Sequence, residues 1–311
     1  MNKLKVSVSP HIHSGVTTQK IMLDVIIALL PAAVAGCLIF GARSLLVILT
    51  SVAAAVLAEL LFCLACKREI TIYDLSAVVS GLILALSLPV TMPLWQVAVG
   101  AVFAIIIVKC IFGGIGQNFA NPAVTARVFM IIAFSKTVAA TATPKGVDAV
   151  SSATPLVILE GTAKGELPSI IDMLLGKRAG AIGETCVVAL VIGGLYLMIK
   201  RVISWHTPVA FIASTFVFIL IFTGDPKAAL YHTLLGGLFI GAIFMATDYS
   251  TTPTNTMGKV VFGIGAGFIT SVIRIWGSLP EGVSYAILLM NILTPYIEKL
   301  TRKKPLGGDK A

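Results

Sequence analysis

Long runs of apolar residues, separated by short polar segments, make up most of the chain. A helix needs about 20 mainly apolar residues to cross a hydrocarbon core roughly 30 Å thick. Runs of about this length recur throughout, and 136–183 is the one long polar interruption. The pattern predicts an all-α polytopic membrane protein with ten spans, at roughly 21–41, 44–65, 72–90, 93–112, 120–135, 184–200, 206–223, 228–247, 258–276 and 283–298.

The predicted spans divide into two sets of five, within 21–135 and 184–298. Short matches relate the two sets. Ser80-Gly81-Leu82 in the third span matches Gly236-Gly237-Leu238 in the eighth, and the segment 116–120 before the fifth matches 282–286 before the tenth. Because five is odd, the two sets cross the membrane in opposite directions, as in several transporter folds. We therefore predict two inverted five-helix repeats.

Composition supports the membrane assignment. The chain is 57% hydrophobic and 12% charged, with a mean hydropathy of +0.99. This leaves too little polar surface to cover a water-soluble globule, so a water-soluble globular protein is excluded. About twenty mostly polar residues precede the first apolar run, and the run itself contains Asp24. We therefore expect no cleaved signal peptide.

The net charge of +9 is unevenly distributed over the loops. With a cytoplasmic N-terminus, fourteen Lys and Arg residues fall on inside segments and eight outside, five of these in 136–183, where the positive-inside rule has less force. We predict a cytoplasmic arm at 1–20, an extracytoplasmic segment at 136–183 and a basic cytoplasmic tail at 299–311. The charge then reflects topology and attraction to the anionic lipid of the bilayer, with no nucleic-acid partner.

Ionisable residues within or beside the spans are candidates for an ion path. A charge at membrane depth costs about 2.5 to 3.5 kcal/mol on insertion scales and usually faces a protein interior or a water-filled path. Asp24 lies only four residues after Lys20, which favours an interfacial position over a role in an ion path, whereas Glu59 lies deeper in its span. Arg127 and Asp248 complete the set of candidates.

A glycine-rich segment precedes the short fifth span. Three glycines among four residues, Gly113, Gly114 and Gly116, let backbone approach a ligand closely, and Asn118 and Asn121 supply donors and acceptors. The segment is a weak candidate for a phosphate-binding loop, because no strand precedes it and it lacks the lysine of such loops. Glycine or proline breaks beside short spans do indicate a binding site within the membrane.

A second polar motif lies inside 136–183 and contains Asp148, Ser151, Ser152 and Thr154. By itself, Thr154 followed by Pro155 is ordinary chemistry for the start of a helix. A third polar stretch, 247–259, is rich in hydroxyl, amide and acid groups. It can line an ion or cofactor path on the cytoplasmic side, or form a solvated loop.

The cysteines and histidines indicate no metal site. All five cysteines fall in or at the ends of apolar spans, and Cys63 and Cys66 form the single CxxC pair. A redox or cluster role would need further ligands or a βαβ context, so we interpret the cysteines as small buried hydrophobic residues. His11 and His13 are too few for a zinc site. We predict no catalytic residue in this chain.

Several of these motifs together resemble one family, which comprises the D subunit of the Rnf electron transport complex and the B subunit of the sodium-pumping NADH:quinone reductase. The resemblance covers nearly the whole chain. Two departures occur in the motif around Thr154, where Ala149 and Ser152 replace usual glycines. The matching segments are Ser9-Pro10-His11-Ile12-His13-Ser14, the glycine signature 113–123, Asp148 to Thr154, Thr247-Asp248 with its Pro-Thr turn, and Pro280-Glu281-Gly282.

The resemblance implies a flavoprotein subunit of a bacterial cell-membrane complex, not catalytic alone, that passes electrons between reduced ferredoxin and NAD and exports Na⁺ or H⁺. Thr154 would carry FMN through a phosphoester bond made by a flavin transferase, with Asp148, Ser151 and Ser152 around it. A neighbouring protein of the complex would hold a second covalent flavin. A noncovalent riboflavin within the spans is also implied, and the Gly113 to Asn121 region is our candidate for it.

Three alternatives stay open. The B subunit of the quinone-reducing pump usually has a longer N-terminal extension than the roughly twenty residues found before the first span here. A flavin-free secondary transporter or channel would suit an inverted repeat but gives no reason for the Thr154 motif. A purely structural membrane scaffold is disfavoured by Glu59, Arg127 and Asp248. The chain contains no evident nucleotide fold or iron-sulfur motif, so NAD and ferredoxin would bind to other peripheral or membrane subunits.

Overall fold

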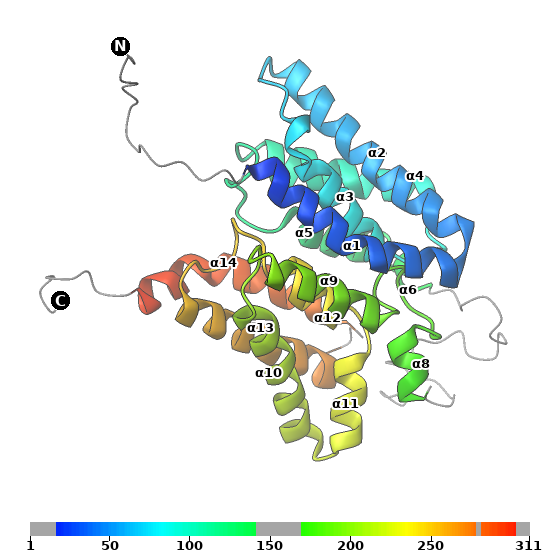
Figure 1. Ribbon diagram of the computed structural model, residues 1–311, viewed down its shortest axis with the longest axis vertical. Coiled ribbons are helices and arrows are strands. Elements are labelled where there is room, and N and C mark those ends of the chain that lie inside the picture. Colours follow the sequence, from blue (N-terminus) through cyan, green and yellow to red (C-terminus); the bar gives the residue numbers. More distant parts are fainter. Residues whose placement is uncertain (1–16, 141–168, 278–280, 303–311) are drawn as a thin grey trace, which may run out of the picture.

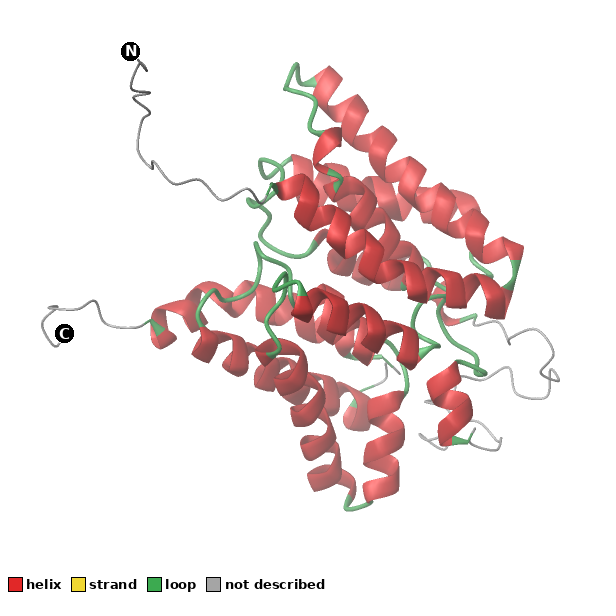
Figure 2. Ribbon diagram, viewed as in Figure 1, coloured by secondary structure: helices red, strands yellow, loops and turns green. Residues whose placement is uncertain are grey.

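The computed structural model describes residues 17–140, 169–277 and 281–302, and within these ranges the chain forms helices joined by turns and loops, without strands (Figure 2). The prediction of an all-helical polytopic protein is therefore confirmed. Asp148, Ser151, Ser152 and Thr154 lie outside the described residues.

The first half of the chain forms one group of helices (Figure 1). A turn at Gly41, whose φ is 85°, joins the first two helices, and the Asn121 side chain caps the helix that begins at Pro122. The elements are α1 (Thr18–Phe40), α2 (Ala42–Ala65), the short η1 (Ile72–Asp74), α3 (Ser76–Leu86), α4 (Leu94–Val102), which continues into the π-helical η2 (Phe103–Cys110), α5 (Pro122–Ala133) and α6 (Ser135–Ala139).

The second half forms a second group, and the helix that begins at Pro226 is broken after Leu234. Two helical pieces meet there at an angle of 64° around Gly236, whose φ is 69°. The elements are α8 (Ile170–Leu175), α9 (Val187–Ile199), α10 (His206–Thr223), α11 (Pro226–Leu234), α12 (Leu238–Ile240), the π-helical η3 (Gly241–Met245), α13 (Thr256–Trp276) and α14 (Val283–Thr301).

The helices run between two opposite faces of the molecule. We call one the Thr18 face; it holds the start of α1, the loops 111–121 and 246–255 and the end of α14. The other is the Gly41 face; it holds the Gly41 turn, the 87–93 turn and the ends of α5 and α6. Arg43 Nε donates to the Val90 carbonyl at 2.9 Å and so ties two turns of the Gly41 face together. Both ends of the described chain lie at the Thr18 face (Figure 1).

Each predicted span falls on a helix, but several helices are shorter than predicted. Four helices, α1, α2, α10 and α13, are long and apolar enough to cross a bilayer, and the bent pair formed by α11 with α12 and η3 makes a fifth. In contrast, α3 has 11 residues, α5 has 12 and α9 has 13. At 1.5 Å per residue these reach only about 16 to 20 Å. Loops therefore enter the membrane depth here, which is tolerated where protein covers them.

Equivalent helices pair across the two halves. Helix α1 packs on α9, and α5 packs on α14. Within the halves, α2 packs on α3 and α4, while α10 packs on α11 and α13. The same neighbours in each half are the arrangement expected of two inverted repeats, and the domain boundaries themselves stay a prediction.

Glycine permits the closest of these helix crossings. A Cβ on Gly193 of α9 would lie 2.0 Å from the Ala28 carbonyl oxygen of α1. On α13, a Cβ on Gly263 would lie 2.7 Å from Ala210 Cβ and 3.0 Å from Phe211 N of α10. Small residues at these crossings thus allow close helix packing.

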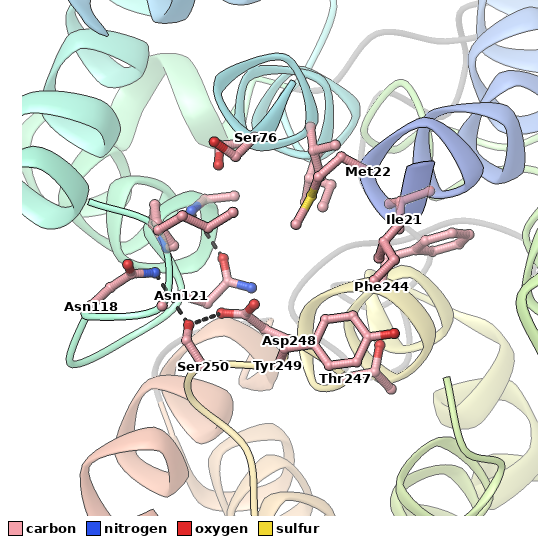
Figure 3. Close-up of a pocket in the computed structure, with 18 of the residues that line it drawn as sticks. Ile21, Met22, Ser76, Asn118, Asn121, Phe244, Thr247, Asp248, Tyr249 and Ser250 are labelled. Atoms are coloured by element: carbon pink, nitrogen blue, oxygen red, sulfur yellow. Dashed lines mark hydrogen bonds between the residues drawn. The ribbon is translucent and has the colours of Figure 1, made fainter. Parts of the chain in front are cut away.

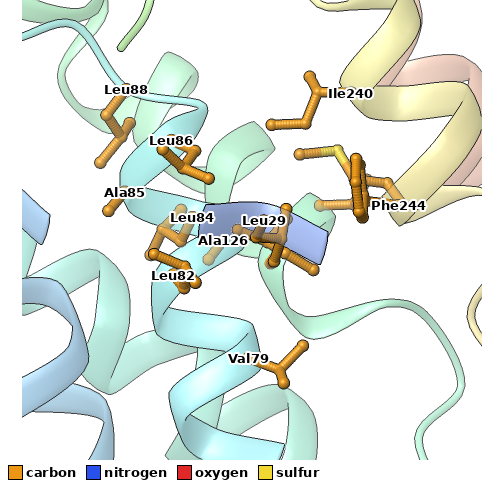
Figure 4. Close-up of a cluster of buried hydrophobic side chains, with 14 of the residues drawn as sticks. Leu29, Val79, Leu82, Leu84, Ala85, Leu86, Leu88, Ala126, Ile240 and Phe244 are labelled. Carbon is orange, nitrogen blue, oxygen red and sulfur yellow. The ribbon is translucent and has the colours of Figure 1, made fainter. Parts of the chain in front are cut away.

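One apolar core joins the halves. Leu29 of α1, Leu84 and Leu86 of α3, Ala126 of α5 and Ile240 of α12 are fully buried within it (Figure 4). Conversely, long helices present large apolar side chains outward, with Leu38 78%, Leu61 63% and Ile221 66% exposed. Such surfaces suit contact with lipid.

Replacing Gly193 with valine should weaken the crossing of α1 and α9. The added carbons meet backbone at Ala28, which cannot move as a side chain can, so we expect a loss of about 1 to 3 kcal/mol in the free energy of unfolding. Thermal unfolding of the detergent-solubilised protein measures this. Ile192→Phe enlarges a neighbouring, 54% exposed residue and is the control. Equal midpoints for both variants would contradict this crossing.

Candidate functional site

A cavity of about 440 Å³ opens between the two halves near the Thr18 face (Figure 3). Its walls come from the start of α1, the start of α3, the loop before α5 and the segment that follows η3. Most of the wall is apolar, and polar groups are gathered in a few places, as is usual for a small-molecule site. Residues that line it include Ile21, Met22, Ser76, Ser80, Lys109, Gly116, Asn118, Asn121, Phe244 and Asp248.

The glycine-rich loop forms part of this wall. Gly113, Gly114 and Gly116 have φ angles of 121°, 100° and 83°, a region that residues with a Cβ rarely adopt. A Cβ on Gly114 or Gly116 would meet nothing within 4 Å, so backbone conformation, not space, requires glycine there. Gly116, Asn118 and Asn121 line the cavity, whereas Gly113 and Gly114 shape the turn before it.

The loop of the first half meets the 246–255 loop of the second half beside the cavity. Asn118 Nδ2 donates to Ser250 Oγ at 3.3 Å. Ser250 Oγ donates to Asp248 Oδ2 at 3.1 Å (Figure 3). Thr251 Oγ1 donates to the same oxygen at 3.1 Å. Desolvation raises the pKa of Asp248 above its usual value, and these hydrogen bonds oppose the rise. The two polar stretches singled out in the sequence are thus neighbours.

Asn121 has a structural role in addition to lining the cavity. Its Oδ1 accepts from the backbone N–H groups of Ala123 and Val124 and caps α5, with Pro122 at the first helical position. Its Nδ2 donates to the Met245 carbonyl at 3.1 Å. One side chain therefore starts a helix of the first half and holds it to η3 of the second.

Glu59 is paired within the protein interior. Its side chain on α2 is 1% exposed, and its Oε1 lies 2.7 Å from Lys109 Nζ of η2. Lys109 also lines the cavity. The prediction that Glu59 would face protein, not lipid, is consistent with this position. Its cationic partner 50 residues away could not be read from the helical pattern.

Arg127 lies in a separate cluster of buried charges. It contacts Glu281 and lies 3.6 Å from Glu184 Oε2. Arg178, also buried, donates to the Glu184 backbone carbonyl at 2.8 Å. Gly237, at the break between α11 and α12, packs directly against this cluster. The sequence reasoning missed the roles of Glu184 and Arg178, and the match around Glu281 was the one available signal.

The remaining candidates lie elsewhere. Asp24 is partly buried and accepts a hydrogen bond from Tyr196 of α9 at 2.7 Å, so it links the two halves away from the cavity. Cys63 is buried but Cys66 is exposed, so the interpretation of all cysteines as buried was wrong for Cys66, which lies in the turn after α2. The described cysteines form no disulfide with one another.

The sequence model of the NQR2, RnfD, RnfE family matches residues 5–307. The chain belongs to this family. The resemblance inferred from the motifs is thus confirmed, and the glycine signature and the Thr247-Asp248 turn of this family member lie on two sides of one cavity.

Relatives within the family align along their whole length. The chain is 43% identical to the D subunit of the Na⁺-translocating ferredoxin:NAD⁺ oxidoreductase complex of Acetobacterium woodii, over 100% of this chain and 98% of the relative. It is 42% identical to the D subunit of the proton-translocating ferredoxin:NAD⁺ oxidoreductase complex of Clostridium ljungdahlii, over 98% and 97%. The D subunit of the ion-translocating oxidoreductase complex of Ectopseudomonas mendocina is 34% identical, over 97% and 95%.

The Arg127 cluster should be critical for stability. Arg127→Gln leaves the Glu184 and Glu281 carboxylates facing each other with one cation fewer, and breaking a buried pair in this way costs about 3 kcal/mol or more. We expect a lower thermal unfolding midpoint in detergent. The double variant Arg127→Gln with Glu281→Gln removes both charges and should recover part of the loss; no recovery would show that Glu281 is not the electrostatic partner.

Proposed function

We propose that this chain is the D subunit of an ion-translocating ferredoxin:NAD oxidoreductase, a membrane flavoprotein component of a redox-driven pump. The full-length similarity to named D subunits carries the proposal. The chain alone performs no complete reaction, because ferredoxin and NAD would bind to other membrane and peripheral subunits. Its own contribution would be to place redox groups across the bilayer and to tune them, since electron transfer belongs to the cofactors.

The orientation follows from the charge distribution. We propose that the Thr18 face is cytoplasmic and the Gly41 face extracytoplasmic, as the positive-inside rule favours. The segment that carries Thr154 leaves the described structure after Ala140 and returns at Ser169, and the flanking α6 and the Gly176 to Cys186 stretch pack at the Gly41 face. Thr154 is then extracytoplasmic, where the second covalent flavin of a partner protein would exchange electrons with it.

The covalent cofactor would be FMN, joined to Thr154 by a phosphoester bond. The family membership and the motif Asp148 to Thr154 support this assignment. The small residues beside Thr154 leave room for a flavin transferase to bring its substrate to the hydroxyl. Ala149 and Ser152 are both small enough to preserve that room where the family usually has glycine.

A second, noncovalent flavin would bind in the cavity at the Thr18 face, and riboflavin is the form that the family suggests. The cavity volume of about 440 Å³ lies within the range of small-molecule sites. Ile21, Met22 and Phe244 would contact an aromatic ring system, and Asn118 and Asp248 would bind the polar atoms at its edge. These groups fit a flat heterocycle with one polar edge.

We propose that ions pass along the charged groups between the cavity and the Gly41 face. Arg127 lies six residues along α5 from Asn121, on the way from the cavity to the Gly41 face. We propose that the cluster of Arg127, Glu184 and Glu281 borders the ion path on that side, and that Asp248 and Glu59 border it at the cavity. Asp24, held by Tyr196, is a weaker candidate for this path.

A flavin-free channel or transporter is the second candidate, because two pseudo-symmetric helix groups around a central cavity also suit solute passage. The B subunit of the quinone-reducing pump belongs to the same family and differs in the partners it would assemble with. The presence or absence of flavin separates the channel from both redox subunits.

Thr154→Val should abolish covalent flavin. We expect the wild-type chain, expressed with a flavin transferase, to fluoresce under ultraviolet light after denaturing electrophoresis, and the variant to be dark, because valine has no hydroxyl to form the ester. Thr162→Val, in the same segment but outside the motif, is the control and should fluoresce. No fluorescence from wild type, with the transferase active on another target, would favour the channel.

Filling the cavity should remove the noncovalent flavin. Ser80 lines the cavity from α3, and Ser80→Trp would occupy space that a flavin ring needs. In a Thr154→Val background we expect the purified protein to release flavin on acid extraction and the Ser80→Trp variant to release little. Leu57→Trp, at a 56% exposed position on α2, controls for the added bulk. Equal flavin content in both tryptophan variants would place the flavin elsewhere.

A further inference from the structure

A chain of hydrogen bonds leads from the Thr18 face to the wall of the cavity. Thr71 lies exposed in the loop between α2 and η1, and its Oγ1 donates to Glu59 Oε1 at 2.6 Å. The same carboxylate oxygen accepts from Lys109 Nζ at 2.7 Å. Lys109 lines the cavity. Three side chains thus connect solvent to the cavity without a gap.

Ser76 and Asp74 hold the Lys109 ammonium against the cavity. Lys109 Nζ donates to Ser76 Oγ at 2.5 Å. The Ser76 hydroxyl proton is directed the other way, because Ser76 Oγ donates to Asp74 Oδ1 at 2.5 Å and Ser76 N donates to the same oxygen at 2.8 Å. The free electron pairs of Ser76 Oγ therefore face Lys109. Ser76 is a positioning residue in this arrangement.

Two of the three N–H bonds of the Lys109 ammonium are occupied by Glu59 and Ser76. An ammonium group has a third N–H bond. Since Lys109 and Ser76 both belong to the cavity wall, this bond is available to a ligand there. Lys109 lies in the π-helical η2, and π-helical turns occur frequently at functional sites.

Stability alone gives a weak reason for this pair. Lys109 and Glu59 are 3% and 1% exposed, and moving two charges from water into such an environment costs several kcal/mol for each ion. A well-packed apolar pair is often at least as stable. Moreover, Glu59 Oε2 is buried without a hydrogen-bond partner. A line of polar and charged groups that connects solvent to a cavity is therefore better explained by transfer than by packing.

We propose that Thr71, Glu59 and Lys109 form a proton-transfer path between the Thr18 face and a redox ligand in the cavity. The proposal rests on the noncovalent flavin proposed above, and adds the residues that balance its charge. A flavin bound there would take up protons when it is reduced, and Lys109 would supply one by giving up the proton of its third N–H bond. The Glu59 carboxylate would first take a proton from the Thr71 side and would then pass it to the Lys109 amine.

The path is completed at the surface. Glu59 receives a proton from the Thr71 hydroxyl, which takes one from solvent, so one solvent proton replaces each proton given to the ring. The electrons come from the redox chain of the complex and the steps reverse on oxidation. Other ionisable or charged groups around the path are Cys63, beside Thr71, Arg68, which donates to the Cys110 carbonyl, Asp74, below Ser76, and Asp248, in the cavity wall.

The test separates electron arrival from proton uptake. Full-length protein with Thr154→Val, so that flavin is present only in the cavity, is reduced by a flash with a ruthenium polypyridyl sensitiser. Flavin absorbance reports the electrons, and a pH-indicator dye reports protons taken from solution. In this parent we expect proton uptake to follow reduction closely.

Lys109→Arg is the decisive variant. Arginine keeps the positive charge beside Glu59, but a guanidinium does not release its proton. Measured per bound flavin, we expect electron arrival close to that of the parent and proton uptake slower by about 100-fold, the size typical for loss of an acid-base group. Glu59→Gln should also slow proton uptake per bound flavin, with a lower thermal midpoint because it leaves the buried Lys109 charge without its partner. Parent-like uptake in both folded variants would overturn the path and leave the flavin proposal intact.

Thr71 offers a test that does not disturb the interior. Thr71→Val removes the hydroxyl at an exposed position and should slow proton uptake, while Thr71→Ser retains it and should not. The effect should be smaller than at Lys109, because water can take the place of a surface hydroxyl. If Lys109→Arg fails to fold, equal uptake in the two Thr71 variants overturns the path. A parent that binds no flavin overturns both this proposal and the proposed cavity flavin.

Discussion

The requirement that every backbone polar group be satisfied inside a bilayer governs this architecture. Three helices, α3, α5 and α9, are too short to cross, so the loops that continue them lie at membrane depth. The long helices α1, α2, α10 and α13 cover these interior segments and face lipid with large apolar side chains. Nine of the eleven residues of α3 are buried. Because the interior segments are shielded, irregular backbone can line a cavity at the Thr18 face.

Charged groups in this interior also have their partners within the protein. Each buried charge that could serve an ion path has an opposite charge or a set of hydrogen-bond donors beside it: Glu59 has Lys109, Arg127 has Glu184 and Glu281, and Asp248 has Ser250 and Thr251. Two of these arrangements border the cavity, and the Arg127 cluster lies farther along α5 toward the Gly41 face. Buried charges are therefore found at two separate positions in the protein, beside the cavity and in the Arg127 cluster.

The break between α11 and α12 lies against the Arg127 cluster. Gly236 and Gly237 separate α11 from α12 and put backbone against Arg127 and Glu184. The equivalent position in the first half, Ser80-Gly81, lies in the continuous helix α3, and there Gly81 allows α2 to approach, with Ser51 Oγ donating to its carbonyl at 2.7 Å. The two halves thus share helix order and neighbours but use the matching glycines for different purposes. The cavity, built mainly from unlike loops, shows the same divergence.

Some features of the sequence depend only on residues that are close together in the chain: the length of apolar runs, the charge bias between loops and the local motifs. From these features the sequence alone determined the all-helical membrane class, the positions of the ten helices, the common face of the two ends and the family. The tertiary structure decided what depends on residues far apart in the chain. Glu59 and Lys109 are 50 residues apart, Asn118 and Ser250 are 132 apart, and Arg127 and Glu281 are 154 apart. No local pattern specifies such pairs, because they form only when α2 packs beside η2 and when the two halves close on each other. The short lengths of α3, α5 and α9 were also undetermined, because apolar residues in a buried loop and in a spanning helix have the same composition.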